Sequence, residues 1–314
     1  MNRTTRIKSL LNLHTGVFVA IGLLCLTPFI SSPMALVLGF VLASVGWVPT
    51  HWDLGALTKK LLAYSIVGLG FGIQLPEAIE TTANNFPLIV GSIFFTLALG
   101  IIITRALDFD TVSGHLIASG TAICGGSAIA AVAPAINAHN NQTAVALAVV
   151  FVLNSVALFL FPAIGHLLQM SQYDFGVWSA IAIHDTSSVV GAAGAYGDEA
   201  LKIATTVKLA RALWIVPVAL ISALLFGGNK RSVKIPYFIV FYGIAIGVAY
   251  VFPQGQVTYD LIFEFSKRLL VLCLFLIGAS ITVQKIRASG HKPMLLGIIL
   301  WIAIATVSLL YIIL

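Results

Sequence analysis

Charged residues are scarce in this chain of 314 residues. Asp, Glu, Lys and Arg make up 9% of it, whereas they make up roughly a quarter of a soluble domain. Hydrophobic residues account for 59%, and the mean hydropathy is +1.04. The apolar runs are long and unbroken, which excludes the short alternating strands of a membrane barrel. The composition therefore predicts an all-α fold, a polytopic bundle of transmembrane helices.

Cysteines and enzyme motifs are also rare or missing. The three cysteines, Cys25, Cys124 and Cys273, lie in apolar runs at spacings unlike a metal site or a disulfide framework. The sequence contains no Walker-type phosphate loop, no His-Glu-x-x-His, no CxxC pair and no nucleophile elbow. We therefore expect a protein that is not an enzyme and that has no cofactor and no bound metal.

Apolar segments of about 20 residues are long enough to cross a bilayer as helices. Candidate spans cover 14–31, 33–49, 60–76, 87–105, 142–167, 201–227, 236–252, 266–284 and 293–314. The first could imitate a secretory signal, because Arg3, Arg6 and Lys8 precede it. We favour a first transmembrane helix, because the rest of the chain is equally apolar.

The basic residues predict the orientation of these spans. The net charge of +6 does not indicate a nucleic-acid partner, because Lys and Arg occupy short loops between apolar runs. With the N-terminus in the cytoplasm, most of the 17 basic residues fall on the inner side, and Lys202, Lys267 and Arg268 fall at the outer edge. We therefore expect a multi-pass protein with a cytoplasmic N-terminus and an external C-terminus. An acidic loop with Glu77 and Glu80 would lie outside.

Two segments rich in small residues interrupt the apolar pattern and resemble one another. Ile123–Ala133 (ICGGSAIAAVA) and Ile183–Ala193 (IHDTSSVVGAA) align Ile on Ile and Ser127 on Ser187, and a long apolar helix follows each. Irregular backbone inside a bilayer needs protein or a polar cavity to satisfy its hydrogen bonds. Paired interruptions are therefore a sequence indicator of a transporter's binding site.

A second pair of copies flanks these interruptions. Residues 33–105 and 236–314 share features at matching places, such as Pro33 with Pro236 and Pro87 with Pro293, and would face opposite ways through the membrane. We expect one membrane domain in which these copies form an inverted repeat. The core would comprise 112–167 and 175–227. Its two interrupted segments either re-enter the membrane, giving nine spans, or cross it, giving eleven; we favour re-entry.

Lys208 and Arg211 are the cations that lie deepest in a predicted span. At 1.5 Å per residue from Lys202, Arg211 is about 14 Å deep, near the middle of a ~30 Å apolar layer. A charge at this depth costs at least ~2.5 kcal/mol and faces a partner or a cavity. One interpretation is a buried ion pair with Asp185. The other is an anion site built from both cations.

His184 and Asp185 lie at the centre of the second interruption. A carboxylate beside an imidazole within the membrane is suited to relaying protons. Alternatively, Asp185 is the N-cap of a half-helix that begins near Thr186. Either way, the hydroxyl and N–H groups of Thr186, Ser187 and Ser188 would lie near the site.

The first interruption, Gly120–Ser127 (GTAICGGS), is the second half of the predicted site. Gly125 and Gly126 permit a turn or a close approach, and a helix that starts after them would direct its N–H groups toward an anion. Close helix packing through small residues is the alternative, but it explains the run from Thr121 through Cys124 to Ser127 poorly. Asn154, at the place that matches Arg211, either lines the site or bonds between helices.

Three segments together resemble a known family. GTAICGGSAIAAVAPAI (Gly120–Ile136), IHDTSSVVGAA and ALKIATTVKLARALWIVP (Ala200–Pro217) resemble the YeiH-type bacterial membrane proteins, a family whose name attributes sulfate export to it. The resemblance covers essentially the whole chain. It implies the bacterial inner membrane, a distant relation to cation–proton antiporters and anion transporters, and the two interruptions as the centre of the site.

These observations lead to one hypothesis and several rivals. We expect a secondary active transporter that carries a small anion, such as sulfate or a related sulfur oxyanion, and is coupled to H⁺ or Na⁺ or works by exchange. A sodium–proton antiporter, a passive channel and a membrane receptor are the alternatives. Such transporters are often dimers, so a homodimer in the lipid bilayer is one expected assembly.

Overall fold

The computed structural model describes residues 3–49, 52–227, 237–280 and 290–314. Within these ranges the chain is helical and contains no strand. Pro236, predicted to open a helix in the second copy, lies outside them. Pro33 and Pro87 fall in the first turns of their helices, as predicted.

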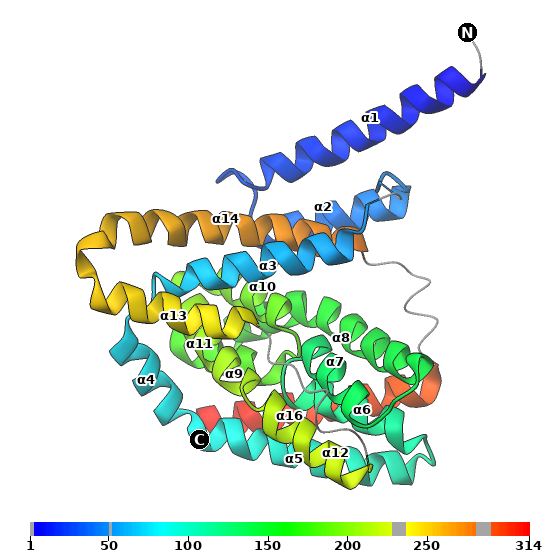
Figure 1. The fold of residues 1–314 in the computed structure, drawn as a ribbon, viewed down its shortest axis with the longest axis vertical. Helices are drawn as coiled ribbons and strands as arrows, with labels where there is room; N and C mark the ends of the chain where they lie inside the picture. Colours follow the sequence, from blue (N-terminus) through cyan, green and yellow to red (C-terminus); the bar gives the residue numbers. More distant parts are fainter. Residues whose placement is uncertain (1–2, 50–51, 228–236, 281–289) are drawn as a thin grey trace.

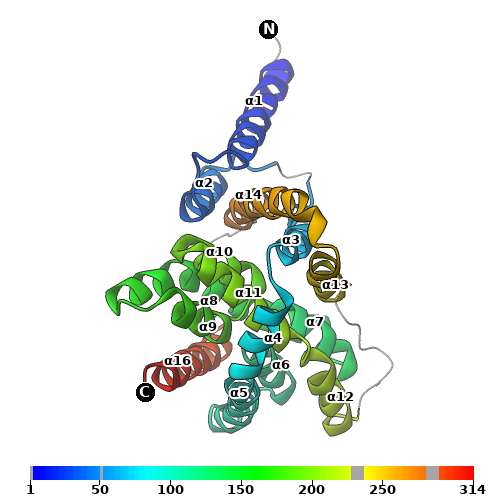
Figure 2. The same ribbon diagram turned by 90° about the vertical axis from the view of Figure 1, so that its left-hand side faces the viewer.

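The helices form two layers (Figures 1 and 2). The scaffold layer consists of α2 (Ser32–Val45), α3 (Leu54–Gly70), α13 (Tyr237–Val251) and α14 (Gln256–Ser280), with α1 (Arg3–Leu24) beyond it and η2 (Pro253–Gly255) before α14. The core layer consists of α5 (Phe86–Ala106), α6 (Thr111–Ala122), α7 (Gly126–Ala135), α8 (Asn140–Leu167), α9 (Gln172–Ala182), α10 (Thr186–Tyr196), α11 (Asp198–Ala212), α12 (Ile215–Leu225) and α16 (His291–Ile313). α4 (Leu75–Asn84) connects the layers.

Length and apolar composition identify the helices that could cross a membrane. In the described part of the chain these are α5, α8, the continuous segment Asp198–Leu225 and α16, with the bent pair α3–α4 as a fifth. Shorter apolar helices cover His14–Leu24, Met34–Val45, Gly126–Ala135 and Tyr237–Val251. The prediction of a polytopic helical membrane protein is therefore confirmed. The orientation of the termini stays a prediction.

The segment around Glu77 differs from the prediction. The expected span 60–76 ends at Gly70, and the chain bends by 105° into α4. The expected acidic loop is therefore a helix. The sequence explains why a helix begins here. Pro76 and Glu77 lie in the first turn of α4, where proline and a negative charge favour a helix start.

Small residues set the closest helix crossing in the scaffold. A methyl group added to Gly39 of α2 would lie 2.0 Å from the carbonyl oxygen of Phe275, and one added to Gly278 of α14 would lie 2.1 Å from that of Leu36. The two backbones can approach so closely only because neither position carries a side chain. Gly68, Gly70 and Gly72 likewise lie so close to α13 or α14 that an added methyl group would collide with these helices.

Both interruptions are breaks between two short helices. The first break, Ile123–Gly125, separates α6 from α7, and the second, Ile183–Asp185, separates α9 from α10. Each half has 10 to 12 residues, about half the thickness of an apolar layer at 1.5 Å per residue. Whether the halves re-enter or cross stays a prediction.

The helices after the breaks interlock. α8 packs on α6 and also on α10, while α11 packs on α9 and its continuation α12 packs on α7. Each long helix therefore contacts the broken helix of both copies, and this arrangement brings the two breaks together. The inverted relation of the copies to a membrane stays a prediction.

Candidate functional site

The two breaks touch at Gly125 and Asp185. Gly125 has a φ of +65°, which an L side chain rarely adopts. A methyl group at this position would lie 3.3 Å from the Cα of Asp185 and 3.1 Å from a methyl of Val150. Two separate constraints therefore require glycine at this position: the backbone angle and the close approach of Asp185.

Asn154 of α8 binds the backbone of the second break. Its Oδ1 accepts hydrogen bonds from the N–H groups of His184, at 3.1 Å, and Asp185, at 3.2 Å. Asn154 is 3% exposed, and its Nδ2 has no hydrogen-bond partner among the described residues. The side chain thus bonds between helices, as one of the two interpretations held, and leaves a donor free at the break.

Lys208 and Arg211 hold the carbonyl end of α9. Lys208 Nζ donates to the carbonyl oxygens of Ile183, at 2.7 Å, and Ala180, at 3.2 Å, and Arg211 Nη1 donates to that of Ile181. The last carbonyls of a helix have no partner within the helix and carry partial negative charge, so cations stabilise them. Both side chains are 0% exposed.

The interpretation that these cations form a buried ion pair with Asp185 names the wrong partner. Among the described residues Asp185 forms no salt bridge. The cations do hold the second interruption in place, as that interpretation required, but through peptide carbonyls. Local sequence could not distinguish the two, because a carboxylate and three helix-end carbonyls lie within a few residues of each other.

Asp185 is the N-cap of α10. Its carboxylate accepts hydrogen bonds from the backbone N–H of Ser187, at 3.1 Å, and from the Ser187 hydroxyl, and the helix begins at Thr186. The capping interpretation is therefore confirmed. Thr186, Ser187 and Ser188 are buried in the first turn.

Unsatisfied polar atoms gather at the breaks. Within the described residues, seven buried side-chain N or O atoms lack a hydrogen-bond partner. Six of them belong to residues in or beside the breaks: the Thr121 hydroxyl, Asn154 Nδ2, both ring nitrogens of His184, and Nε and Nη2 of Arg211. Buried polar groups are nearly always paired, so a cluster of this kind indicates a place for water, an ion or a ligand.

The first break supplies a different kind of group. Thr121 is 0% exposed at the end of α6, Cys124 is buried, and Gly126 and Ser127 are partly buried. The N-cap of α7 is Gly125, which has no side chain to accept a hydrogen bond from the first turn, and the Cys124 thiol interacts with the backbone N–H of Ala128. The N–H groups at the start of a helix carry partial positive charge. Here they lie at the junction with the second break.

A buried histidine escaped the sequence interpretation. His115 lies five residues after a loop, and its Nε2 lies 2.7 Å from Ser222 Oγ of α12 while its ring lies against Phe226. The contact arises because α12 packs beside this part of the core. No local pattern predicts that contact.

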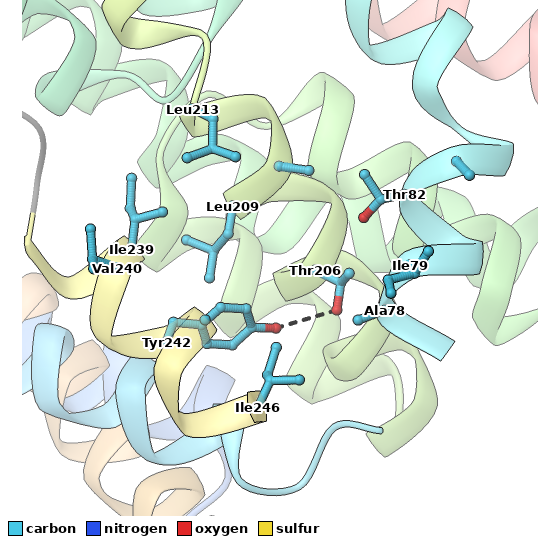
Figure 3. Close-up of a pocket in the computed structure, with 13 residues that line it drawn as sticks. Ala78, Ile79, Thr82, Thr206, Leu209, Leu213, Ile239, Val240, Tyr242 and Ile246 are labelled. Carbon is cyan, nitrogen blue, oxygen red and sulfur yellow. Dashed lines mark hydrogen bonds between the residues drawn. The ribbon is translucent and has the colours of Figure 1, made fainter. Parts of the chain in front are cut away.

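One cavity lies away from the breaks. It has a volume of about 590 Å³ and lies between α4, α11 and α13, and its lining is almost entirely apolar. Figure 3 shows its most prominent polar contact, 3.3 Å between the hydroxyls of Thr206 and Tyr242. Leu209 of α11 and Leu213, the residue after this helix, line the cavity, whereas Lys208 and Arg211 donate hydrogen bonds to carbonyl groups of the α9 end.

No metal centre emerges from the described residues. No group of three or more His, Cys, Asp or Glu side chains among them is placed to hold an ion. Within the described part of the chain, Cys25, Cys124 and Cys273 are buried free thiols. Besides hydrogen-bond donors, two cations and one carboxylate, the breaks carry the His184 imidazole and the Cys124 thiol.

Fold and site together define a polytopic helical membrane protein with two broken helices that meet in its core. The model of the family "Conserved hypothetical protein 698" matches residues 11–311, and the chain belongs to this family. A "UPF0324 membrane protein" of Shewanella oneidensis is 70% identical over 312 residues, 99% of each chain. That of Bacteroides thetaiotaomicron is 43% identical over 294 residues, 93% of this chain and 89% of the relative. No solved structure matches the chain.

Proposed function

We propose that this protein is a secondary active transporter of a small anion and that the junction of the two breaks is its binding site. Sulfate or a related sulfur oxyanion is the substrate class we favour, in the inner membrane of a bacterium. The observation that carries the proposal is the cluster of unpartnered buried polar atoms on Thr121, Asn154, His184 and Arg211. An oxyanion would satisfy them, because most of them are donors.

The formal charges at the junction favour an anion as well. Lys208 and Arg211 bring two positive charges, and Asp185 brings one negative charge, so one positive charge remains. A buried charge without a partner is costly, and an anion that binds beside it would recover part of that cost. The N-terminus of α7, where the N-cap is a glycine, adds further attraction for negative charge.

His184 and Asp185 are the groups we assign to ion coupling. The His184 ring is fully buried, and neither nitrogen has a partner among the described residues. An imidazole in this position could take up a proton together with an anion, which would keep the total charge of the site constant. Proton-coupled transport or exchange would follow.

The rival sodium–proton antiporter needs a carboxylate paired with a cation. Within the described structure the Asp185 carboxylate is occupied by Ser187, and the cations bind α9 carbonyls. This arrangement supports the anion proposal over the antiporter.

Thr121→Val tests the proposal. Valine has nearly the same shape as threonine, and the hydroxyl that it removes has no partner among the described residues, so the fold should be unaffected. We expect weaker sulfate binding in a thermal-shift titration and slower sulfate uptake into proteoliposomes. Thr104→Val is the matched control, because it removes the seventh unpartnered atom, on α5 against Gly114 and away from the breaks.

The outcome separates the alternatives. Equal sulfate binding and uptake by the wild type and both variants would contradict the proposed site. A sodium-dependent pH change without any anion would instead support the antiporter. A ligand-induced rise in stability is expected only where the ligand binds the folded state.

A further inference from the structure

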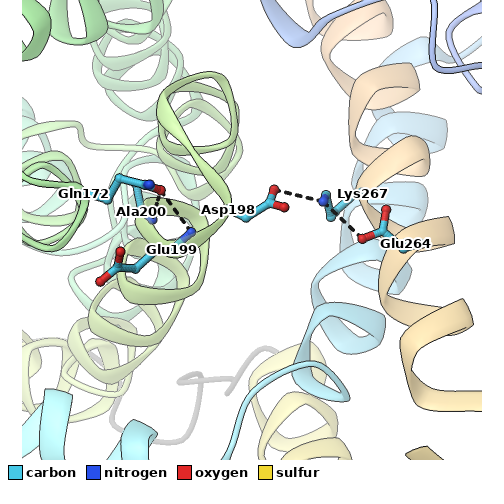
Figure 4. A network of polar contacts seen from close by, with 6 residues as sticks. All are labelled: Gln172, Asp198, Glu199, Ala200, Glu264 and Lys267. Atoms are coloured by element: carbon cyan, nitrogen blue, oxygen red, sulfur yellow. Dashed lines mark hydrogen bonds and ion pairs between the residues drawn. The ribbon is translucent and has the colours of Figure 1, made fainter. Parts of the chain in front are cut away.

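An ion pair connects the core layer to the scaffold layer. Lys267 Nζ of α14 lies 2.8 Å from the Asp198 carboxylate at the first residue of α11 (Figure 4). Lys267 also pairs with Glu264, at 3.2 Å, but Glu264 belongs to the same helix. Among the described residues, the Asp198 pair is thus the one salt bridge between two helices.

Asp198 is fixed to the element that carries the second break. Gln172 Oε1, in the first residue of α9, accepts hydrogen bonds from the backbone N–H groups of Glu199, at 3.1 Å, and Ala200, at 3.3 Å. The start of α11 is therefore held to the start of α9. Any displacement of these two helices relative to α14 must break the contact of Asp198 with Lys267.

A second cavity lies beside this ion pair. It has a volume of about 310 Å³, and α10, α14 and the segment before α2 form its walls. Lys267 and Arg268 line it together with Ser31, and the remaining lining is mostly apolar, for example Val190 and Leu274. Arg268 is partly buried, and its guanidinium makes one long hydrogen bond of 3.5 Å, to the carbonyl of Thr27.

The two carboxylates that pair with Lys267 are both exposed to solvent. The Lys267 side chain is 22% exposed, whereas the Asp198 side chain is 68% exposed and that of Glu264 is 58% exposed. An exposed carboxylate in an ion pair is bound weakly and exchanges with solutes, because water screens the attraction. Lys267 also lies 5.5 Å from the centre of the Phe263 ring, which keeps its ammonium in place when the carboxylate leaves.

We infer that Lys267 and Arg268 form a second anion site, in which the Asp198 carboxylate acts as a tethered anion that an incoming small oxyanion displaces. The displacement breaks the ion pair between core and scaffold. Binding of the anion at this site therefore raises the local concentration of substrate and also removes the ion pair that holds the core layer to the scaffold layer. This site lies on the predicted outer side, and its role rests on the anion transport proposed above.

Chemical labelling at Ser31→Cys tests the inference without any transport. The purified protein in detergent is treated with two methanethiosulfonate reagents of similar size, one carrying a sulfonate and the other a quaternary ammonium. The native cysteines are buried, and unsubstituted protein gives the background. We expect the sulfonate reagent to react several-fold faster than the ammonium reagent and sulfate to slow its reaction.

The preference should respond to the ion pair. Asp198→Asn should raise the ratio of the two rates, because it removes one of the two carboxylates that pair with Lys267, and Lys267→Gln should lower it. Glu199→Gln is the matched control: it removes the neighbouring carboxylate, which makes no ion pair in the described structure, and should leave the ratio unchanged.

Two results would overturn the inference. One is equal rates for both reagents, and the other is a ratio that Asp198→Asn and Glu199→Gln change equally. Labelling that behaves as expected, combined with unaltered sulfate transport in Thr121→Val, would keep the second site and remove the proposed central site. Each of the two proposals can therefore be contradicted without the other.

Discussion

Gly125 of the first break lies directly against Asp185 of the second: a β-carbon added to Gly125 would stand 3.3 Å from the Cα of Asp185. This contact joins two segments that are 60 residues apart in the chain and gives each break a different task. The second break is held by side chains, from Asn154, Lys208 and Arg211. At the first break the backbone of Gly125 sets the geometry: its φ is +65°, and its N–H donates to the carbonyl oxygen of Gly120 at 2.8 Å.

Gly125→Ala should therefore damage both the fold and the binding site. A φ of +65° with a ψ of −122° lies outside the left-handed helical region and costs an L residue about 1–3 kcal/mol, and the added methyl would press on Asp185 and Val150. We expect a loss of at least about 1 kcal/mol in the free energy of unfolding and a loss of sulfate binding. Gly91→Ala is the control, because a methyl group there meets nothing within 4 Å in α5. Equal thermal stability of the two variants would contradict the contact.

Substitutions at Asn154 should separate structure from binding. Asn154→Ala leaves the N–H groups of His184 and Asp185 without an acceptor, at about 1–3 kcal/mol for each. Asn154→Asp keeps the acceptor oxygen but adds a negative charge. We expect the alanine variant to unfold at lower temperature, and the aspartate variant to stay folded and bind sulfate more weakly. Stronger sulfate binding by the aspartate variant would argue against an anion at this place.

The positions of the two breaks could be predicted from the sequence. The paired glycine- and serine-rich segments located both breaks, and the residue type of Asp185 indicated the cap of α10. The partners of Lys208 and Arg211 could not be predicted, because they are peptide carbonyls and every residue carries one. The bend before α4 was missed because hydropathy averages over Gly70 and Pro76, although Pro76 itself marks a helix start.

Asp110, outside the predicted spans, allows a prediction on pH. Partial burial raises the pKa of its carboxyl, but hydrogen bonds from Ser113 and Gln142 outweigh burial and lower the pKa below its ordinary value. The carboxylate caps α6, with the Ser113 N–H at 2.8 Å. A lowered pKa stabilises the fold above the unfolded value of about 3.9, and this contribution is lost as the pH falls through the folded value.

Asp110→Ala should accordingly cost about 1 kcal/mol at neutral pH, the usual contribution of an N-cap. The difference in thermal stability between this variant and the wild type should shrink as the pH is lowered below about 4. Asp110→Asn, which keeps a capping oxygen, should lie close to the wild type at neutral pH. A difference that grows in acid would contradict the assigned sign.

Arg211→Lys should separate the two tasks of this side chain. Arg211 Nη1 binds the carbonyl of Ile181, and Nε and Nη2 have no partner among the described residues. A lysine keeps the charge and can still donate to Ile181, but it lacks the planar fork that binds two oxygens of an oxyanion at once. We expect little change in melting temperature and at least a tenfold loss of sulfate affinity, about 1.4 kcal/mol.

Lys208→Met is the contrasting variant, because it leaves the carbonyls of Ile183 and Ala180 unpaired and should lower stability. If Arg211→Lys bound sulfate as well as the wild type, the free face of the guanidinium would not be the contact that holds the anion.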